Sequence, residues 1–247
     1  MKIRSYLPPE LWSQETVHLA GAEAHHLIRV LRVAKGEELV CFDGEGHEAR
    51  AVVSDITRHK ISLALKEKKQ TPLRAYQLTL AAAVPGNVKF DQIVDQATQL
   101  EVSRIIPVLT ERTIVTIPEK GRVKKQSRWN KIARAAGKQS GVSRLPVVEP
   151  VCAWKDLMRV LPQYPVALIA TTDGPYEKIS SVLQQVDQGK IIILIGPEGD
   201  FTIPEIEQAV HAGAHRLSLG PSIMRCETAV VVAVGLVSSF LWEKSWR

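Results

Sequence analysis

Two glycine-containing segments in the second half of the chain are the clearest candidates for chemistry. In the first, the apolar run 191–195 leads directly into Gly196-Pro197-Glu198-Gly199, and a helix start follows. Thr202 and Glu205 have the spacing of a capping box, which satisfies backbone N–H groups in the first turn of a helix. Glycines at the carboxyl end of a strand allow a ligand to approach the backbone closely. An ordinary tight connection between a strand and a helix explains the same pattern equally well.

The second segment combines another glycine break with charged side chains at a helix start. The apolar run 217–219 is followed by Gly220-Pro221, and Arg225 and Glu227 then lie where helical spacing begins. A glutamate at that end is favoured by the helix dipole, which is a sufficient structural reason for Glu227. A cation just before a helix N-terminus is locally unfavourable, so Arg225 needs a partner and is the stronger functional candidate.

Several common catalytic and binding motifs are absent from the sequence. It contains no G-x-G-x-x-G, no G-x-x-x-x-G-K-[ST], no H-E-x-x-H and no G-x-S-x-G. These absences argue against a standard dinucleotide fold, a P-loop enzyme, a zinc protease and an α/β-hydrolase. The cysteines Cys41, Cys152 and Cys226 are odd in number and far apart, so neither a disulfide framework nor a metal site is expected.

The elements that must position these segments fall into two regimes. Residues 1–70 show short alternating runs, a turn signal at 43–46 and one helix-like stretch at 24–32, which predict a small β-barrel domain. Over 75–247, apolar runs alternate with helical spacing, which predicts a parallel sheet with helices on both faces. The expected strands of this second domain are 78–84, 105–109, 166–170, 191–195 and 217–219, and its expected helices include 127–139, 179–186, 203–212 and 227–242.

Charge and hydropathy limit the classes of partner. The formal net charge is +6, and residues 120–138 carry only basic charges, which favours a polyanionic partner. No run of 18 apolar residues is present, because the longest candidate, 229–242, is interrupted by glycine and serine. The first six residues lack the apolar centre of a signal peptide. We therefore expect a cytoplasmic protein with no membrane partner.

The two glycine segments also resemble known motifs. LIGPEGDF, followed by LSLGPSIMRCETA, is similar to the two C-terminal motifs of the SPOUT methyltransferases. HHLIRVLRVAKGEELVCFDGEG resembles the N-terminal PUA-like barrel of one branch, the RsmE family of 16S ribosomal RNA uridine N3-methyltransferases. VKFDQIVDQATQLEVSRIIPVLTERT and RWNKIARAAGKQSGVSRLPVVEP resemble two further motifs of that family. The ordered matches extend over both predicted domains.

This resemblance implies a fold, a cofactor and partners. The implied fold is α/β, with a SPOUT-type parallel sheet, a C-terminal trefoil knot and an N-terminal PUA-like β-barrel. The implied cofactor is S-adenosyl-L-methionine, and the implied partners are the 16S ribosomal RNA of the small subunit and a second copy bound through the catalytic domain. The residues implied to bind the cofactor are Thr171, Thr172, Ile195, Gly196, Pro197, Gly199, Leu217, Leu219, Gly220, Ile223, Met224 and Thr228.

The implied reaction assigns roles to charged residues. Uridine N3 carries a proton, so methyl transfer requires a base or a group that stabilises the N3 anion. Arg225 is the candidate stabiliser, and Glu198 and Glu227 are candidate bases, with nothing in the sequence to decide between them. Seven cations are candidates for RNA contact: Arg29, Arg32, Arg104, Arg112, Lys124, Lys125 and Arg128.

Four positions depart from the usual motifs of the family. Asp200 replaces a glycine, Ser222 an arginine, Cys226 a threonine and Lys138 a glutamate. These changes exclude a cation at 222 and an acid at 138 from any shared mechanism. Two alternatives stay open at this point, namely another SPOUT enzyme acting on ribose or transfer RNA, and a non-catalytic RNA-binding factor of ribosome assembly.

Overall fold

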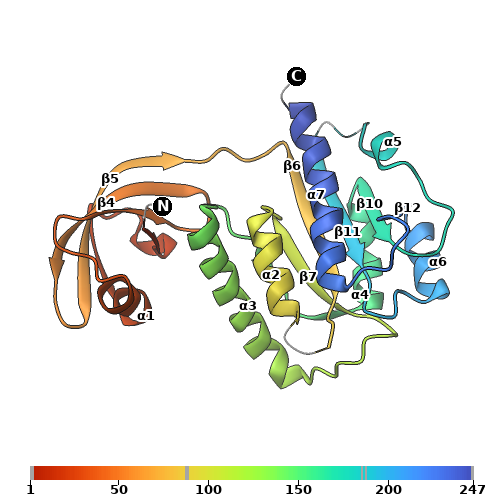
Figure 1. Ribbon diagram of the computed structural model, residues 1–247, viewed down its shortest axis with the longest axis horizontal. Helices are drawn as coiled ribbons and strands as arrows, with labels where there is room; N and C mark the ends of the chain where they lie inside the picture. The colour runs from red at the N-terminus through yellow and green to blue at the C-terminus, as the bar shows by residue number, and fades with distance from the viewer. Residues whose placement is uncertain (1–2, 87–88, 185, 187, 246–247) are drawn as a thin grey trace. The chain divides into compact units, whose positions relative to one another are not determined.

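The chain folds into two compact units. The computed structural model describes residues 3–86, 89–184, 186 and 188–245 (Figure 1). One unit comprises residues 1–73 together with 134–145, and the other comprises 74–133 and 146–247. The sequence-based division assigned 134–145 to the second domain. Leu145 donates its backbone N–H to the carbonyl of Gly44 at 2.9 Å, so this segment is bonded to the N-terminal unit.

The N-terminal unit contains a five-stranded sheet in the order β1-β3-β4-β5-β2. The strand β1 pairs with β3 in parallel, and the other neighbours are antiparallel. Ile61, Leu63 and Leu65 alternate with more exposed residues and are buried, as the period of two predicts. The strands are β1 (Arg4–Tyr6), β2 (Thr16–Ala20), β3 (Glu38–Phe42), β4 (His47–Ile56) and β5 (Lys60–Gln70).

The helix predicted at 24–32 begins earlier and changes its winding. A helix α1 (Gly21–His25) is followed directly by one π-helical stretch, His26–Val30. Ala24 and Leu27 are buried in the core of the unit. Short 3₁₀ turns occupy Pro9–Leu11 in this unit and Leu161–Gln163 in the other.

A buried carboxylate reinforces the N-terminal unit. Arg4 lies 2.7 Å from Glu48, Lys69 lies 2.7 Å from the other Glu48 oxygen, and Ser143 donates to the same carboxylate. Burial alone would raise the pKa of Glu48, but the hydrogen bonds from Lys69, Ser143 and Arg4 outweigh it and lower that pKa to about 2. Glu48 is therefore ionised throughout the neutral range.

The predicted parallel sheet of the second unit is confirmed. Its strand order is β12-β10-β11-β6-β7-β8, with the short β9 pairing with β7, and every pairing is parallel. Strand β10 and residues 191–195 of β11 are aliphatic throughout because both faces of the sheet are covered there. The strands are β6 (Tyr76–Ala83), β7 (Arg104–Leu109), β8 (Val147–Val148), β9 (Cys152–Ala153), β10 (Val166–Ala170), β11 (Gly189–Ile195) and β12 (Ala214–Leu217).

Helices cover both faces of this sheet. Ile191, Ile193 and Ile195 pack into one apolar core with residues of α2 and α7, whereas Ile192 and Leu194 pack into the other with residues of α4 and α6. The helices are α2 (Lys89–Gln99), α3 (Glu119–Ser140), α4 (Trp154–Val160), α5 (Ile179–Gln184), α6 (Ile203–His211) and α7 (Cys226–Ser245) (Figure 1).

The predicted bounds of α3 and β12 differ from the structure. The basic helix α3 begins at Glu119 rather than at 127. The prediction missed this start because the first two turns are polar and present no apolar stripe; even Val123 is 72% exposed. The last strand occupies Ala214–Leu217 rather than 217–219. This strand is at the edge of the sheet, where polar side chains such as His215 and Arg216 are tolerated.

The helix α7 is more apolar than the sequence analysis allowed. Its 18-residue window Cys226–Glu243 has a mean hydropathy of 1.5, so length and composition alone would permit a membrane span. Half of that window is buried against the rest of the structure. Val230, Ala233 and Val237 lie in the core of the second unit, which is the behaviour of a helix packed in a globular domain.

Candidate functional site

The carboxyl ends of the neighbouring strands β10, β11 and β12 surround a crevice of about 530 Å³. Three loops, at 171–176, 196–200 and 218–224, supply most of its wall, and two residues of α7 complete it. The wall is mainly apolar, with hydroxyl, backbone and carboxylate groups between the apolar side chains. The lining residues are Ala170, Thr171, Thr172, Tyr176, Ile195, Gly196, Pro197, Glu198, Asp200, Ser218, Leu219, Gly220, Pro221, Ser222, Ile223, Met224, Cys226 and Ala229.

The loop after β11 is held tightly at both ends. A Cβ at Gly196 would lie 3.1 Å from the backbone nitrogen of Phe201, so any other residue would push the following backbone away by a few tenths of an ångström. Asp200 donates its N–H to the carbonyl of Pro197 at 2.9 Å. The predicted capping box is present, with Thr202 and Glu205 each accepting from the other's backbone N–H. The loop therefore has one defined path into α6.

The segment after β7 braces the same loop from another side. Glu111 donates its backbone N–H to the Glu205 carboxylate at 2.8 Å. Arg112 donates from its guanidinium to the carbonyl of Gly199 at 2.6 Å. Arg112, predicted from the sequence to contact RNA, is thus bonded to the backbone of the crevice loop, and its RNA contact stays a prediction.

The N-terminus of α7 carries the charged residues predicted for catalysis. Arg225 is exposed and immediately precedes the helix, between the lining residues Met224 and Cys226. Glu227 is only 8% exposed, and its Oε2 has no hydrogen-bond partner among the residues that the structure describes. A buried carboxylate oxygen without a donor is costly, so this oxygen of Glu227 is available to accept a hydrogen bond.

Cys226 joins the two glycine loops. Its thiol donates to the carbonyl of Gly196 at 3.2 Å and is buried. Burial raises the pKa of Cys226 to about 11, and the carboxylates of Glu198 and Glu227 contribute to the rise. The cysteine that replaces the usual threonine of the motif therefore acts as a neutral hydrogen-bond donor.

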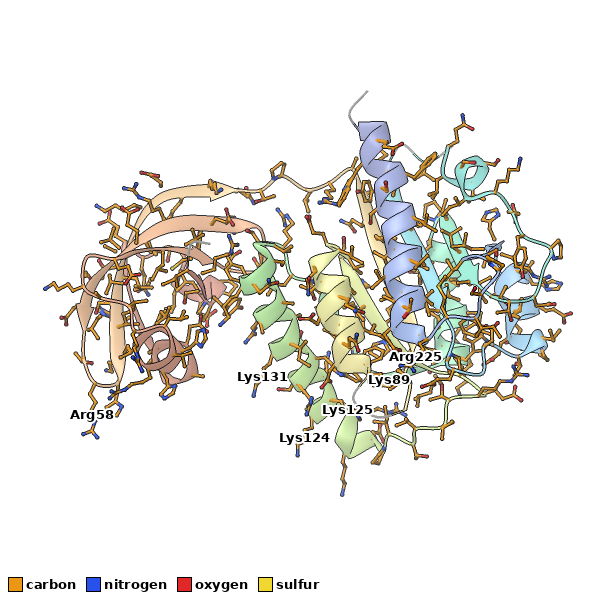
Figure 2. The ribbon with its side chains drawn as sticks, in the orientation of Figure 1. Arg58, Lys89, Lys124, Lys125, Lys131 and Arg225 are labelled. Atoms are coloured by element: carbon orange, nitrogen blue, oxygen red, sulfur yellow. The ribbon has the colours of Figure 1, made fainter. Side chains whose placement is uncertain are left out.

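Lys89 is a charged residue of the site that the sequence analysis missed. Its ammonium lies 3.3 Å from Glu198, which lines the crevice. Lys89 begins α2 and Arg225 precedes α7, and these two helices pack against each other (Figure 2). A lysine that closely follows a buried apolar run is the one signal visible in the sequence, and nothing there places this lysine beside Glu198.

Nine of the twelve residues predicted to bind the cofactor line the crevice, and Gly199, Leu217 and Thr228 do not. Leu217 is buried in the core, and its carbonyl accepts from the N–H of Thr171 at 3.2 Å. Gly199 is in contact with Arg112, and Thr228 is exposed on α7. Of the candidate bases, Glu198 lines the crevice and Glu227 is buried outside its wall.

The other predicted RNA contacts occupy varied environments. In the second unit, Arg104 is paired with Glu149, and Arg128 donates to Asp91 at 2.8 Å. Lys124 is exposed, and Lys125 lies 5.8 Å from the ring centroid of Trp129 (Figure 2). In the N-terminal unit, Arg29 and Arg32 are exposed.

The departure from the family motif at Lys138 lies in the N-terminal unit. Lys138, where the motif usually has an acid, forms an ion pair with Glu23 at 2.9 Å within the N-terminal unit. Among the residues that the structure describes, no group of three or more His, Cys, Asp or Glu side chains is arranged to hold a metal ion.

Both units of the chain match known protein families. Residues 71–238 match the family described as RNA methyltransferase domain, and residues 19–66 match the RNA methyltransferase PUA domain. The chain is 32% identical over 245 residues to ribosomal RNA small subunit methyltransferase E of Synechocystis, covering 98% of the chain and 78% of that protein. It is 28% identical over 232 residues to the Bacillus subtilis protein of the same name, covering 90% of each.

A solved structure agrees with these matches. The ribosomal RNA small subunit methyltransferase E of Neisseria gonorrhoeae, solved bound to S-adenosyl methionine, superposes with a TM-score of 0.85 at 28% identity. The match covers 97% of this chain and 98% of that one.

Proposed function

Because the chain belongs to the RNA methyltransferase family that carries a PUA domain, we propose that it transfers a methyl group from S-adenosylmethionine to N3 of a uridine in 16S ribosomal RNA. The observation that carries this proposal is the crevice at the carboxyl ends of β10, β11 and β12, with Glu198 on its wall and Arg225 beside it. In parallel α/β sheets, ligands bind outside these strand ends.

The residues of the crevice fit this cofactor. Its volume of about 530 Å³ lies within the range of small-molecule sites. Ile195, Leu219 and Ile223 offer an apolar slot for an adenine ring, and the hydroxyls of Thr171 and Thr172 offer polar contacts. The carboxylate of Glu198 brings negative charge to a site that must accept a sulfonium. When bound, S-adenosylmethionine supplies an electrophilic methyl group on a cationic sulfur.

Positioning is the main task of the protein in such a reaction. The acceptor nitrogen must lie behind the methyl carbon in line with the breaking C–S bond, and fixed geometry of this kind is worth about 7–11 kcal/mol. The loop 196–201 is suited to it because Arg112 and the capping box at Thr202 and Glu205 fix its backbone. A rigid wall holds the donor while the RNA supplies the acceptor.

Arg225 and Glu198 carry the proton chemistry in this proposal. The proton on uridine N3 passes to the Glu198 carboxylate, the N3 lone pair forms the new N–C bond, and the C–S bond breaks to leave a neutral thioether. Arg225 stabilises the N3 anion as it forms. Glu198 is preferred to Glu227 as the base because Glu198 lines the crevice, whereas Glu227 is buried outside its wall.

Basic residues supply the affinity for RNA. Lys124 and Lys131 are exposed on α3 within the second unit (Figure 2), and Arg29 and Arg32 are exposed on the N-terminal unit. Their contacts to phosphates release counterions, so the binding constant should fall steeply between about 50 and 200 mM salt. An affinity that is constant over this range would contradict the assignment of these cations.

A second copy of the chain is the proposed partner at α7. Val231, Leu236 and Trp242 of this helix are 36%, 45% and 37% exposed. A helix that is apolar on all sides is normally buried all round, so the exposed part of α7 favours a symmetric contact. Sedimentation should show a dimer, and Leu236→Asp should shift it towards monomer more strongly than Leu236→Ala.

Two finer features of the fold follow from the family resemblance. We infer that the five-stranded N-terminal sheet closes as a PUA-like barrel and that the three loops of the crevice belong to a trefoil knot. The gathering of the loops after β10, β11 and β12 around one crevice supports the knot. Mechanical unfolding of the isolated chain should then end short of its full contour length, because a knot tightens on the extended chain.

Methylation of small subunits tests the activity directly. Subunits from a strain that lacks this gene, incubated with the protein and S-adenosylmethionine, should acquire one 3-methyluridine, detected by nucleoside mass spectrometry. A methylated ribose, or methylated transfer RNA, would assign the chain to another activity of the superfamily. Failure of the protein to bind S-adenosylmethionine in calorimetry would leave a non-catalytic assembly factor. We place the reaction in the cytoplasm, where ribosomal subunits are assembled.

A further inference from the structure

The backbone at position 200 is one that most residues avoid. Asp200 has φ of +62°, in the left-handed region where glycine is at ease and where aspartate and asparagine are the best tolerated of the others. The related motif usually has glycine at this place. An aspartate here accepts backbone strain that a glycine would not have, and contacts of its carboxylate are expected to compensate for that strain.

Both oxygens of the Asp200 carboxylate accept hydrogen bonds from the protein. Its Oδ2 accepts from the backbone N–H of Thr172 at 2.9 Å, from the Thr172 hydroxyl at 2.8 Å and from the Thr171 hydroxyl at 3.4 Å. Its Oδ1 accepts from the N–H of Phe201 at 2.7 Å. A carboxylate with these four donors acts through the loops that it joins rather than by reacting with a ligand.

These bonds connect two walls of the crevice. Every hydrogen bond found between the segments 171–176 and 196–201, both fully described by the structure, ends on Asp200. Thr171, Thr172 and Asp200 all line the crevice. The segment 171–176 is fixed internally by the Tyr176 hydroxyl, which donates to the Thr172 carbonyl at 2.6 Å, so the carboxylate holds an already ordered loop.

We propose that Asp200 is a positioning residue that fastens the 171–176 loop to the 196–201 loop and so sets the crevice in the shape that binds the methyl donor. The part of this proposal that concerns the donor rests on the proposed function; the fastening of the two loops does not. Asp200 has no part in the methyl-transfer step, so its effect should fall on the affinity for S-adenosylmethionine and not on turnover.

Asp200→Gly is the sharpest variant, because glycine adopts the same backbone angles and removes only the carboxylate. If the binding shape is then populated in about one molecule in ten, the Kd and KM for S-adenosylmethionine rise about tenfold. The kcat at saturating donor should stay within about twofold of the wild type. Asp200→Asn keeps one acceptor oxygen and should recover part of the affinity.

Two further variants separate this role from a general loss of charge or stability. Thr172→Val removes one donor to Asp200, and the double variant with Asp200→Gly should lose less affinity than the two single losses combined. Glu177→Gln is the matched control. Glu177 directly follows the 171–176 loop, and its carboxylate pairs with His215 at 2.9 Å and not with Asp200. This control should bind the donor as the wild type does.

A measurement without ligand tests the fastening alone. In hydrogen exchange of the protein in buffer, the Thr172 amide should exchange about tenfold faster in Asp200→Gly than in the wild type and in Glu177→Gln. Unchanged exchange and unchanged donor affinity in Asp200→Gly would overturn the proposal, as would a loss of kcat at constant KM. If the wild type binds no S-adenosylmethionine while the exchange difference is present, the fastening stands and the proposed function fails.

Discussion

The two glycine loops of the crevice both contain a Gly-Pro pair, but they differ in how many hydrogen bonds hold them to the rest of the protein. The loop 196–201 accepts hydrogen bonds from Arg112 and, through Asp200, from Thr172, and it leads directly into the capping box of α6. In the loop 218–225, the Gly220 N–H donates to the Ser218 hydroxyl at 3.3 Å, and the Arg225 carbonyl accepts from the N–H of Ala229 in α7 at 2.8 Å. Its Ile223 is 86% exposed. A strand that ends in Gly-Pro therefore does not by itself predict how firmly the following loop is held.

The difference matches two tasks that a bimolecular transfer requires. A fixed loop suits the donor, because its geometry must exist before the RNA arrives. The less bonded loop contributes Leu219 and Ile223 to the donor slot and also carries Arg225, which suits the acceptor because an RNA base must enter and leave. The predictions below test this difference at Arg225, at the two carboxylates, at the contact between the loops and at the helix cap, from the largest expected effect to the smallest.

The largest effect is expected at Arg225, on the less bonded loop. Arg225→Ala should lower single-turnover methylation of small subunits about 10³-fold, since it removes the cation that stabilises the N3 anion. The Kd for S-adenosylmethionine should change by less than about threefold. Arg225→Lys keeps the charge but not the planar fork and should retain intermediate activity. Full single-turnover activity in the alanine variant would remove Arg225 from the mechanism.

The second effect distinguishes the two carboxylates. Glu198→Gln should reduce kcat about 10²-fold, because it removes the proton acceptor from the crevice wall. Activity of this variant should recover as pH rises and uridine N3 loses its proton to solvent. Glu227→Gln is the paired variant and should have the smaller effect on kcat. The reverse order would transfer the role of base to Glu227, whose Oε2 has no hydrogen-bond partner in the described part of the chain.

A third effect tests the contact between the two loops. The pKa of Cys226 is raised to about 11 from an ordinary value of 9.0, mainly by burial, so its thiol is protonated at neutral pH. The thiolate fraction is then lower by about two orders of magnitude, and alkylation should be slower by about the same factor than for an exposed cysteine. The rate should rise tenfold per pH unit up to about pH 11. Peptide mass spectrometry after iodoacetamide treatment would measure it, and rapid labelling at pH 7 would show that Cys226 does not hold the loops together.

The smallest effect concerns the fixed loop. Thr202→Ala removes one half of the capping box and should destabilise the start of α6 by about 1 kcal/mol. Amides of residues 201–206 should then exchange about fivefold faster with solvent. Ser222→Ala, on the less bonded loop, should leave exchange at α6 unchanged. Equal responses to both variants would show that the two loops do not differ in support.

Much of the second unit could be predicted because its signals are local. The strand at 191–195 is apolar throughout since it is buried on both faces, and the helix α6 carries its capping box in the sequence. The edge strand β12 was placed too late because His215 and Arg216 interrupt the apolar pattern that the interior strands require. The start of α3 was missed because its first two turns show no periodic apolar stripe, and Val123 and Lys124 are exposed.

The loops that form the site could be predicted from the sequence, but the contacts between residues far apart in the chain could not. The glycine loops and Arg225 stand out by residue type and spacing. Lys89 and Glu198 are separated by more than a hundred residues, and their pairing depends on how α2 packs beside the loop after β11. The contact of Arg112 with Gly199 has the same origin, since an exposed arginine in a sequence gives no sign of a backbone carbonyl near it.

The left-handed backbone at position 200 also limits how this loop can evolve. Aspartate and glycine codons differ by a single nucleotide, so a lineage can exchange the two in one step without refolding the turn. Valine, isoleucine or threonine at the same place would clash with the φ of +62°. A saturation library at this codon should return glycine, asparagine and aspartate among its active clones, and the choice among these three is where selection can adjust how strongly the enzyme holds its donor.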